Sequence, residues 1–371
     1  MARKDAKSTK QPTSDRDFVR EACEKFEEAE QHQSDLRQKA ISDYKFAMIP
    51  GHQWDNHLAL KRRNRPCYEF NRIRQMIRRV TGEQLQNRPQ IKLRPTEDED
   101  RTLAEIYQGL IRNIEAVSHA KIAYDLGFTW ACVAGRGAWE IKMEYEREDG
   151  FDKCLLIAPI LDPYSVVFDP AARDFFRRDA RYAFKSTLIS RDKFKELYPG
   201  REVVPFGDGI APNERYWWYE DEVRIAQYWW KEPKRKLIYL LNDGRIVDAV
   251  EFDPIAPEAA RQGITIVQMR EITVDVVKCC LISGRERLTE VIDWPGKYIP
   301  LIINWGEFHV VDGKEYYSGM TRYGRDAQMV HNFELSTLIE VVAKMPNSPL
   351  TATPKMIEGL QSYYERLGYD D

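Results

Sequence analysis

Residues 65–95 read RPCYEFNRIRQMIRRVTGEQLQNRPQIKLRP, and this stretch decides how the rest of the chain is interpreted. Pro66 keeps the entry extended, and Pro89 ends a helical pattern, because proline lacks the amide hydrogen that a helix interior needs. Between the two prolines, four side chains recur on one side of a helix with about 3.6 residues per turn. They are Ile73, Ile77, Val80 and Gln84. The pattern predicts a helix that ends near Asn87 and Arg88 and is followed by a short strand.

The same region carries a strong positive charge. Residues 61–94 contain eleven Lys or Arg and two Glu, a net charge of +9, whereas the whole chain has a formal net charge of -3. One interpretation is a solvated helix face, and an equally favoured one is a face that pairs with acidic groups on a neighbouring subunit. Direct binding of nucleic acid is the third alternative.

Length and composition favour a folded protein with more than one domain. The chain has 371 residues, of which 43% are hydrophobic and 12% aromatic, so two or three domains with substantial cores are expected. No apolar run reaches the roughly 18 residues of a membrane span, and the start of the chain is polar. We therefore expect a cytosolic protein with no membrane partner.

The sequence contains no pattern typical of catalysis, metal binding or cofactor binding. Its six cysteines form no CxxC pair, so free buried thiols are expected, and Cys279 and Cys280 are predicted to pack inside a strand. The sequence has no Walker loop, no GxSxG elbow and no HExxH motif, and the run at 135–137 is too short to hold a phosphate. We therefore expect no enzyme activity, no cofactor and no metal.

Long helices are expected before the first strand. Residues 1–13 are polar and are predicted to be disordered. Ser14 caps a helix that Pro50 stops, and its narrow apolar stripe places it along the surface or against a neighbour. A second helical stretch begins with acidic residues after Thr96 and continues through residue 134. Its apolar positions are Leu103, Tyr107, Leu110, Ile114 and Val117.

Residues 138–312 are expected to form most of the strands. Residues 139–145 alternate apolar and charged side chains, and Asp149-Gly150 is a turn to the next strand. Two further strands are predicted at 223–230 and 236–241. With a helical part at 14–134 and a β-rich part at 138–312, the chain is expected to have an α+β fold.

The last quarter of the chain is again helical. Residues 323–345 form a predicted helix of about 35 Å that Pro346 stops. Its apolar positions are Val330, Phe333, Leu335, Leu338, Ile339, Val342 and Met345. Charged residues along it argue against contact with lipid.

An aromatic cluster is the one remaining candidate for a binding surface. Tyr216-Trp217-Trp218-Tyr219 and Tyr228-Trp229-Trp230 have the composition of a base-stacking platform. Acidic neighbours and the predicted strands favour packing in a core or an interface instead.

Several short motifs in this order resemble the portal proteins of short-tailed bacteriophages. The first group is Arg65-Pro66, Asn71-Arg72, Gln86-Asn87-Arg88-Pro89, Ile91-Lys92 and Arg94-Pro95. Later positions include Asp162-Pro163-Tyr164 and Ser318-Gly319-Met320, followed by Arg322, Asp326, Gln328 and Asn332. These proteins form the ring through which DNA enters and leaves the viral head.

The resemblance implies a portal-type fold with named regions. A wing domain would cover residues 14–317, a first stem helix 318–345, and the start of the clip 346–371. Portals of this type normally continue through a second stem helix, a channel loop and a crown. The chain is therefore expected to be a fragment, a truncated product or an unusually short relative.

The resemblance also implies a role and partners. The chain would form a cyclic ring of about twelve copies, conduct double-stranded DNA in packaging and ejection, and bind the terminase large subunit, tail or adaptor proteins, and capsid and scaffolding proteins. It would reside in the host cytoplasm during assembly and then in the virion, at the portal vertex. The competing hypotheses are a basic nucleic-acid-binding module unrelated to phage and an oligomeric adaptor that handles no DNA.

Charge assigns candidate residues to these roles. A head-to-tail ring interface has two different sides, and the basic strip would face an acidic stretch such as 97–100 or 24–30. The candidate interface residues are Arg72, Arg74, Arg78, Arg79, Arg325 and Asp326. Lys344 and Lys355 are candidates for the channel or the terminase-facing end, because cyclic symmetry repeats each charge as a ring.

Overall fold

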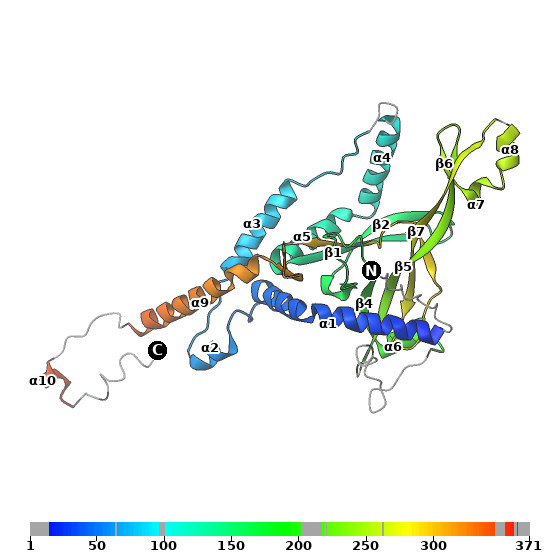
Figure 1. The fold of residues 1–371 in the computed structure, drawn as a ribbon. Helices are drawn as coiled ribbons and strands as arrows, with labels where there is room; N and C mark the ends of the chain where they lie inside the picture. The colour runs from blue at the N-terminus through cyan, green and yellow to red at the C-terminus, as the bar shows by residue number, and fades with distance from the viewer. Residues whose placement is uncertain are drawn as a thin grey trace, which may run out of the picture. The chain divides into compact units, whose positions relative to one another are not determined.

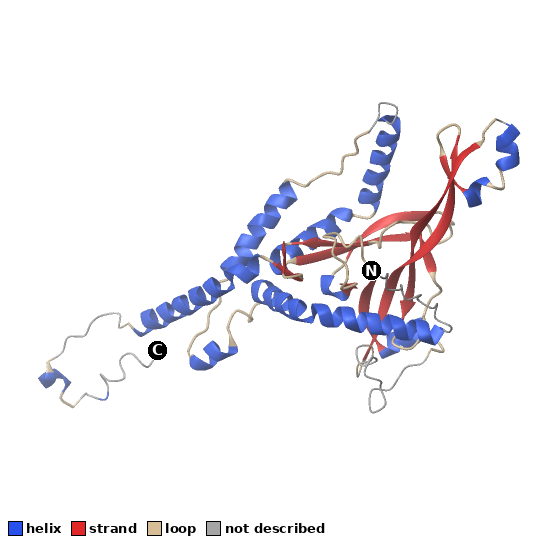
Figure 2. Cartoon of the chain, in the orientation of Figure 1, coloured by secondary structure: helices blue, strands red, loops and turns tan. Residues whose placement is uncertain are grey.

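The computed structural model describes residues 15–63, 65–95, 101–201, 217, 219, 221–261, 263–345, 353–359 and 362. The expected disordered tail, the acidic stretch 97–100, Tyr216 and Trp218 lie outside these residues. Helices and antiparallel strands both contribute, which confirms the α+β class (Figures 1 and 2). Among the described residues, no helix is long and apolar enough to cross a membrane.

The chain divides into two compact units, each built from two segments. Unit 1 comprises Met1–Asp35 and Ala138–Ile303, and unit 2 comprises Leu36–Gly137 and Asn304–Asp371. The assignment of wing, stem and clip is a separate matter and stays a prediction.

Unit 1 is organised by an antiparallel sheet with the order β3-β4-β5-β7-β8, and β6 pairs with β5 at one end. These six strands lie within residues 166–294. The strand bounds are β3 Val166–Phe168, β4 Tyr182–Ser190, β5 Glu222–Leu241, β6 Ile246–Asp248, β7 Ile266–Ile282 and β8 Ile292–Trp294.

Strand β5 is continuous where the sequence predicts two strands. It contains Pro233, which lies in the gap between the two predicted strands. The pairing with β4 ends at Tyr182 and Trp230, so Pro233 lies where β5 is paired with β7 on one side and has lost β4 on the other. A proline is tolerated at such an edge, because its missing N–H leaves no ladder bond unmade. The strand therefore runs through it.

The second sheet has the order β2-β1-β9, with β1 at Arg136–Tyr145, β2 at Lys153–Pro159 and β9 at Leu301–Trp305. Strands β1 and β2 form the hairpin that the Asp149-Gly150 signal predicts, and their last pair is Tyr145 with Lys153. In unit 2, β10 (Glu307–Val311) and β11 (Lys314–Ser318) form a separate hairpin.

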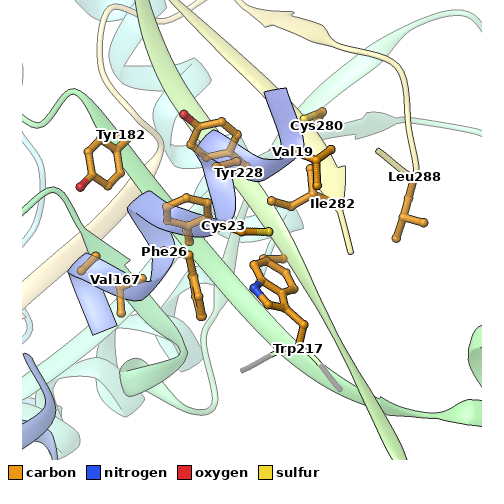
Figure 3. Close-up of a cluster of buried hydrophobic side chains, with 14 of the residues drawn as sticks. Val19, Cys23, Phe26, Val167, Tyr182, Trp217, Tyr228, Cys280, Ile282 and Leu288 are labelled. Carbon is orange, nitrogen blue, oxygen red and sulfur yellow. The ribbon is translucent and has the colours of Figure 1, made fainter. Parts of the chain in front are cut away.

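The first part of helix α1 (Asp15–Met48) lies in the core of unit 1. Phe26 is fully buried, and its ring meets Phe184 edge-on at 5.3 Å and Trp217 at 5.0 Å between centroids. Figure 3 shows Phe26 and Trp217 among the buried hydrophobic side chains of this cluster. The expectation that this helix lies along the surface or against a neighbour is therefore wrong for its first half, because the helix is needed to cover the sheet.

The aromatic cluster belongs to the same core. Trp217 and Tyr228 are buried members of it, and Trp229 is buried against the edge of Trp294. For the described aromatic residues, the prediction of packing in a core is therefore confirmed in preference to a base-stacking platform. Cys279 and Cys280 are free and buried within β7, as predicted, and burial raises the pKa of both thiols to about 12. The expectation of buried thiols is wrong for Cys67, which is exposed, and for Cys132 and Cys154, which are half-buried.

Short elements complete unit 1. Ser190 caps α6 (Arg191–Leu197) as expected, by accepting a hydrogen bond from the Lys193 N–H. A 3-10 turn (Pro163–Ser165), in which Asp162 accepts a hydrogen bond from the Tyr164 N–H, leads into β3. Helices α7 (Ala249–Phe252) and α8 (Ala256–Arg261) pack with Tyr239 in a small cluster at the far end of β5.

Unit 2 is mainly helical. Its elements are the end of α1, then α2 Asn56–Lys61, α3 Arg72–Gln86, α4 Arg101–Val117, α5 Ala120–Ala134, α9 Met320–Lys344 and α10 Pro354–Ile357. The predicted basic helix is confirmed as α3, with Ile73 and Ile77 buried and Asn71 capping it through a 2.9 Å bond from the Arg74 N–H.

The short strand expected after α3 is absent, and residues 88–95 are extended without a strand partner. A single side chain from α4 takes the place of that partner. The Gln108 amide donates to the Ile91 carbonyl at 2.7 Å and accepts from the Leu93 N–H at 2.8 Å. The segment is therefore held by Gln108 and, at Arg88, by an ion pair with Asp125 of α5, and it joins no sheet.

The helical stretch expected through residue 134 is broken into two helices. His119 adopts a left-handed conformation (φ 49°) between α4 and α5, which no composition signal indicated. The predicted break at 135–137 is confirmed. Gly135 has φ 90°, and a Cβ there would lie 2.5 Å from the Ser318 carbonyl carbon, so both the turn and the close approach require glycine.

Candidate functional site

Helix α9 buries its polar side. The helix is predicted by the sequence, but its apolar positions are largely exposed, among them Val330, Leu338 and Val342. The buried residues are Thr321, Gln328, Asn332 and Ser336. Since burying an amide without partners costs free energy, these side chains must find hydrogen bonds inside unit 2.

Three of them bind the backbone of the extended segment that leads into α3. The Asn332 Oδ1 accepts from the Phe70 N–H at 2.9 Å, and the Gln328 Oε1 accepts from the Arg72 N–H at 2.9 Å. The Ser336 Oγ accepts from the Tyr68 N–H at 3.1 Å. We call this set the polar ladder.

The spacing of the ladder follows from the two backbone geometries. Four residues of helix advance about 6 Å, and two residues of extended chain advance about 6.6 Å. Side chains at every fourth helical position therefore match N–H groups at every second extended position. Gln328, Asn332 and Ser336 have this spacing, and so do residues 68, 70 and 72.

The amide nitrogens of the ladder are also paired. The Gln328 Nε2 donates to the Phe70 carbonyl at 2.9 Å and to the Asn332 Oδ1 at 2.8 Å. The Asn332 Nδ2 donates to the Gln53 Oε1 at 2.8 Å, and the Gln53 Nε2 donates to the Phe46 carbonyl at 3.1 Å. The ladder thus connects α9, segment 66–72 and the end of α1.

A second contact fixes the C-terminal half of α9. Arg62, which is 4% exposed, donates to the Thr337 Oγ1 at 2.7 Å and to the Glu340 Oε2 at 3.2 Å. Its guanidinium lies over the ring of Phe333. Lys344 lies 2.9 Å from the other Glu340 oxygen, and this hydrogen bond lowers the pKa of Glu340 against the opposing effect of burial.

A third contact fixes its N-terminal half. The Asp43 carboxylate, buried on α1, lies 2.9 Å from the Arg322 Nε and 3.1 Å from an Arg325 nitrogen. Burial raises the pKa of Asp43, and both guanidinium groups oppose that shift. Arg325, a candidate interface residue, therefore already has an ion pair within its own unit.

The remaining candidates lie mostly on exposed surface. On α3, Arg72, Arg78 and Arg79 are exposed and Arg74 is half-buried. On α9 and α10, Asp326, Lys344 and Lys355 are exposed, and Lys344 binds Glu340. Of the candidate residues, Arg325 forms an ion pair with Asp43. The structure brings no two of the other candidates together, so their assignment to an interface or a channel stays a prediction.

Asp43 and Arg62 are functional anchors that the sequence interpretation missed. Both are charged residues fully enclosed in unit 2. The signal for Asp43 is its position between the buried Ala40 and Ala47 of the α1 stripe, where a solvated side chain has no place. Arg62 has no comparable local signal.

Helix α4 also turns its apolar side outward. Its inner side is held by Gln108 and by Glu115, which accepts from the Tyr124 hydroxyl at 3.2 Å. None of its residues is buried. The exposed apolar side chains are Leu103, Ile106, Tyr107, Leu110 and Val117. Two helices of unit 2 are thus anchored by polar groups and present apolar faces to their surroundings.

An α+β chain whose helices are anchored in this way and show apolar faces has the character of an assembly subunit. Comparison with known proteins specifies the class. The family described as Phage P22-like portal protein matches residues 23–370, so the chain belongs to this family. A portal protein of Acyrthosiphon pisum secondary endosymbiont phage 1 is 27% identical over 359 residues, which cover 92% of this chain and 49% of that protein. The chain thus spans about half the length of this curated relative.

Proposed function

We propose that the chain is a structural subunit of a portal ring that conducts double-stranded DNA during packaging and ejection. In this role it carries no catalytic centre, and the energy for DNA movement comes from a separate terminase motor. The ring stands at one vertex of the virion and is assembled in the host cytoplasm from about twelve copies related by cyclic symmetry.

The observation that carries this proposal is the outward apolar surface of α4 and α9. A solitary soluble chain rarely exposes large contiguous apolar patches, because water disfavours them. Here the apolar stripes run along two helices whose opposite sides are held by hydrogen bonds. Contact with further protein in an assembly removes such stripes from water. Membership of the portal family supports the ring as that assembly.

The candidate residues take roles within the ring. The exposed arginines of α3, Arg72, Arg78 and Arg79, lie on one side of the contact between neighbouring copies, with Arg74, Arg325 and Asp326 at its margin. Lys344 and Lys355 lie toward the channel or the end that binds the terminase, where a ring of like charges is repeated by symmetry. Tail or adaptor proteins and capsid and scaffolding proteins are the other proposed partners.

The oligomeric state of the 371-residue chain tests the proposal. Native mass spectrometry and negative-stain electron microscopy over a range of protein concentrations are expected to show closed rings. Monomers that bind double-stranded DNA, with an affinity that falls steeply as salt increases, would support the basic nucleic-acid-binding module instead. Open or small oligomers that admit no DNA would support the adaptor.

A further inference from the structure

This inference rests on the proposed ring and names the two surfaces that meet in it. A ring closes through a head-to-tail contact, so each copy must carry two different patches that complement each other. One patch lies on α3 in unit 2, and the other lies at the tip of the β1–β2 hairpin in unit 1.

The first patch is a basic stripe around a methionine. Residues 72–79 contain four arginines and no acidic residue. Arg72, Met76 and Arg79 follow the spacing i, i+4, i+7, so they lie on one side of α3, away from the buried Ile73 and Ile77. All three are exposed, and Met76 is 60% exposed although it is apolar.

The second patch is an aromatic side chain surrounded by carboxylates. Residues 144–152 contain five acidic residues and one arginine. The loop that closes the hairpin is folded on itself, with the Glu146 N–H donating to the Asp152 carbonyl at 2.9 Å. At its tip, Phe151 is 95% exposed, more than any other large hydrophobic side chain that is described. Its acidic neighbours are Glu144, Glu146, Glu148, Asp149 and Asp152, and all are exposed.

We propose that Phe151 of one copy packs on Met76 of the next copy, with the hairpin carboxylates facing Arg72 and Arg79. The net charges of the two segments are opposite and equal, since four arginines meet five acids and one arginine. Methionine is adaptable and makes favourable contacts with aromatic rings. An exposed aromatic anchor within a charged rim has the composition of an interface centre.

Other acidic stretches are weaker partners for the α3 stripe. On α1, Glu21 lies 2.7 Å from Lys25, and Glu24 lies 4.0 Å from Arg20, so these carboxylates already have basic neighbours on their own helix. Arg79 of the stripe has a similar exposed neighbour in Glu83 at 3.7 Å, so the apolar anchor is what distinguishes the hairpin. The stretch 97–100 lies outside the described residues. The hairpin is the acidic segment that also offers an apolar anchor.

DNA is a less suitable occupant of the stripe than a second copy. Phosphate binding needs converging Lys and Arg side chains, and it gains nothing from an apolar side chain at the centre of the patch. Met76 occupies that centre. A protein surface that presents both an aromatic ring and carboxylates satisfies the apolar and the charged parts together.

Charge reversal in pairs tests the contact. We expect Glu148→Lys with Asp149→Lys to raise the concentration for half-assembly about tenfold or more, because like charges then face each other. Arg72→Glu with Arg79→Glu should have the same effect, and all four changes together should restore most of the assembly. Sedimentation velocity at low salt measures the assembly of each variant as a function of its concentration. No loss in either pair, or no recovery in the combination, would overturn the proposal.

A matched control separates a specific contact from a change in net charge. Glu196→Lys with Glu258→Lys alters the charge equally at exposed positions on α6 and α8, and it should leave assembly unchanged. If the arginine variant lost DNA binding but kept normal assembly, the stripe would be a DNA site and the proposed contact would be wrong.

Cross-linking in trans gives a second readout. In a Cys67→Ser background, which removes the exposed native thiol, one preparation carries Met76→Cys and another carries Phe151→Cys. A short bis-maleimide should join the two chains in the mixture far more than within either preparation alone. Equal yields in all three samples would contradict the contact. Rings of the unmodified chain without this cross-link would overturn only the inference, whereas monomers at every concentration would overturn the proposed ring as well.

Discussion

Long helices are held in the two units by different kinds of side chain. In unit 1, α1 and the sheet enclose aromatic and aliphatic side chains such as Phe26, Phe184 and Trp217. In unit 2, α9 encloses Gln328 and Asn332 in the polar ladder and is fixed at both halves by buried charged residues. Apolar burial is non-directional, whereas hydrogen bonds define distances and angles.

The difference shows what each unit is built for. Where apolar side chains hold a helix, as they hold the first half of α1, they are already removed from water within the unit. Where polar groups hold the helices of a unit, hydrogen bonds define the register of those helices. Their apolar faces then stay available for contact with other protein. The following four predictions probe this contrast, beginning with the largest expected change in stability.

Removal of an aromatic ring from the unit 1 core should have the largest effect. Phe26→Ala is expected to lower the free energy of unfolding by about 3–5 kcal/mol, because it removes buried area and leaves a cavity. Phe151→Ala makes the same chemical change at an exposed position, and we expect a change below about 0.5 kcal/mol. Urea denaturation of both variants measures the two changes in the free energy of unfolding. Equal losses would show that unit 1 does not depend on this core.

Removal of a ladder amide should have the next largest effect. Asn332→Ala leaves the Phe70 N–H and the Gln53 Oε1 without their partner, so we expect a loss of about 2–3 kcal/mol. Leu338→Ala, on the exposed side of the same helix, should cost about 0.5 kcal/mol or less in the isolated chain. If Leu338→Ala were the more damaging change, α9 would be anchored by its apolar side and the contrast would fail.

Neutralisation of Asp43 should change the free energy of unfolding at neutral pH less than the two ion pairs of this carboxylate suggest. We expect Asp43→Asn to change the free energy of unfolding by about 1 kcal/mol or less, because the cost of burying the charge offsets the pairing. The raised pKa of Asp43 gives the sign of the pH dependence. Its contribution is full below the unfolded value of 3.8 and is lost as pH rises through the folded pKa.

The free energy of unfolding of wild type minus that of Asp43→Asn should therefore fall as pH rises from 4 to 7, as measured by urea denaturation at each pH. A difference that grows with pH would mean that Arg322 and Arg325 outweigh burial. Unit 2 would then depend on net ion pairing at this point.

Neutralisation of Glu340 should have the smallest effect and the opposite pH dependence. Two of its basic partners, Arg65 and Lys344, are more than half exposed, so water screens the interaction. The folded pKa of Glu340 is lowered, so its contribution is present above the unfolded value of 4.5 and is lost as pH falls through the folded pKa. The thermal midpoints of wild type and Glu340→Gln should converge as the pH is lowered from 7 to 3. Parallel midpoints would exclude a role for this charge.

Local signals were sufficient for many elements. The periodic Ile73 and Ile77 predict α3, and Asp149-Gly150 predicts the β1–β2 turn, whereas the Asn71 cap of α3 was not predicted. Cap chemistry and periodicity act within a few residues, so they can be interpreted without the rest of the chain. The basic charge of α3 is also evident in the sequence, and most of its arginines are exposed.

Errors arose where distant segments decide the structure. Residues 88–95 have the composition of a strand, but Gln108 of α4 binds their backbone and no strand lies beside them. Pro233 lies in the gap between two predicted strands, yet the long pairing with β7 carries β5 through it. For α9, periodicity located the helix, but the sequence did not predict which side of it is buried.

Sequence by itself determined the α+β class, the main helices, the basic strip and the resemblance to portal proteins, because each depends on the order and spacing of nearby residues. Tertiary structure alone decided which side of α9 is buried, that Asp43 holds Arg322 and Arg325, and that the extended segment 66–72 binds side chains of a helix far along the chain. The physical reason is that a polar side chain can be buried only where matching donors and acceptors converge on it, and those partners come from segments more than 250 residues apart.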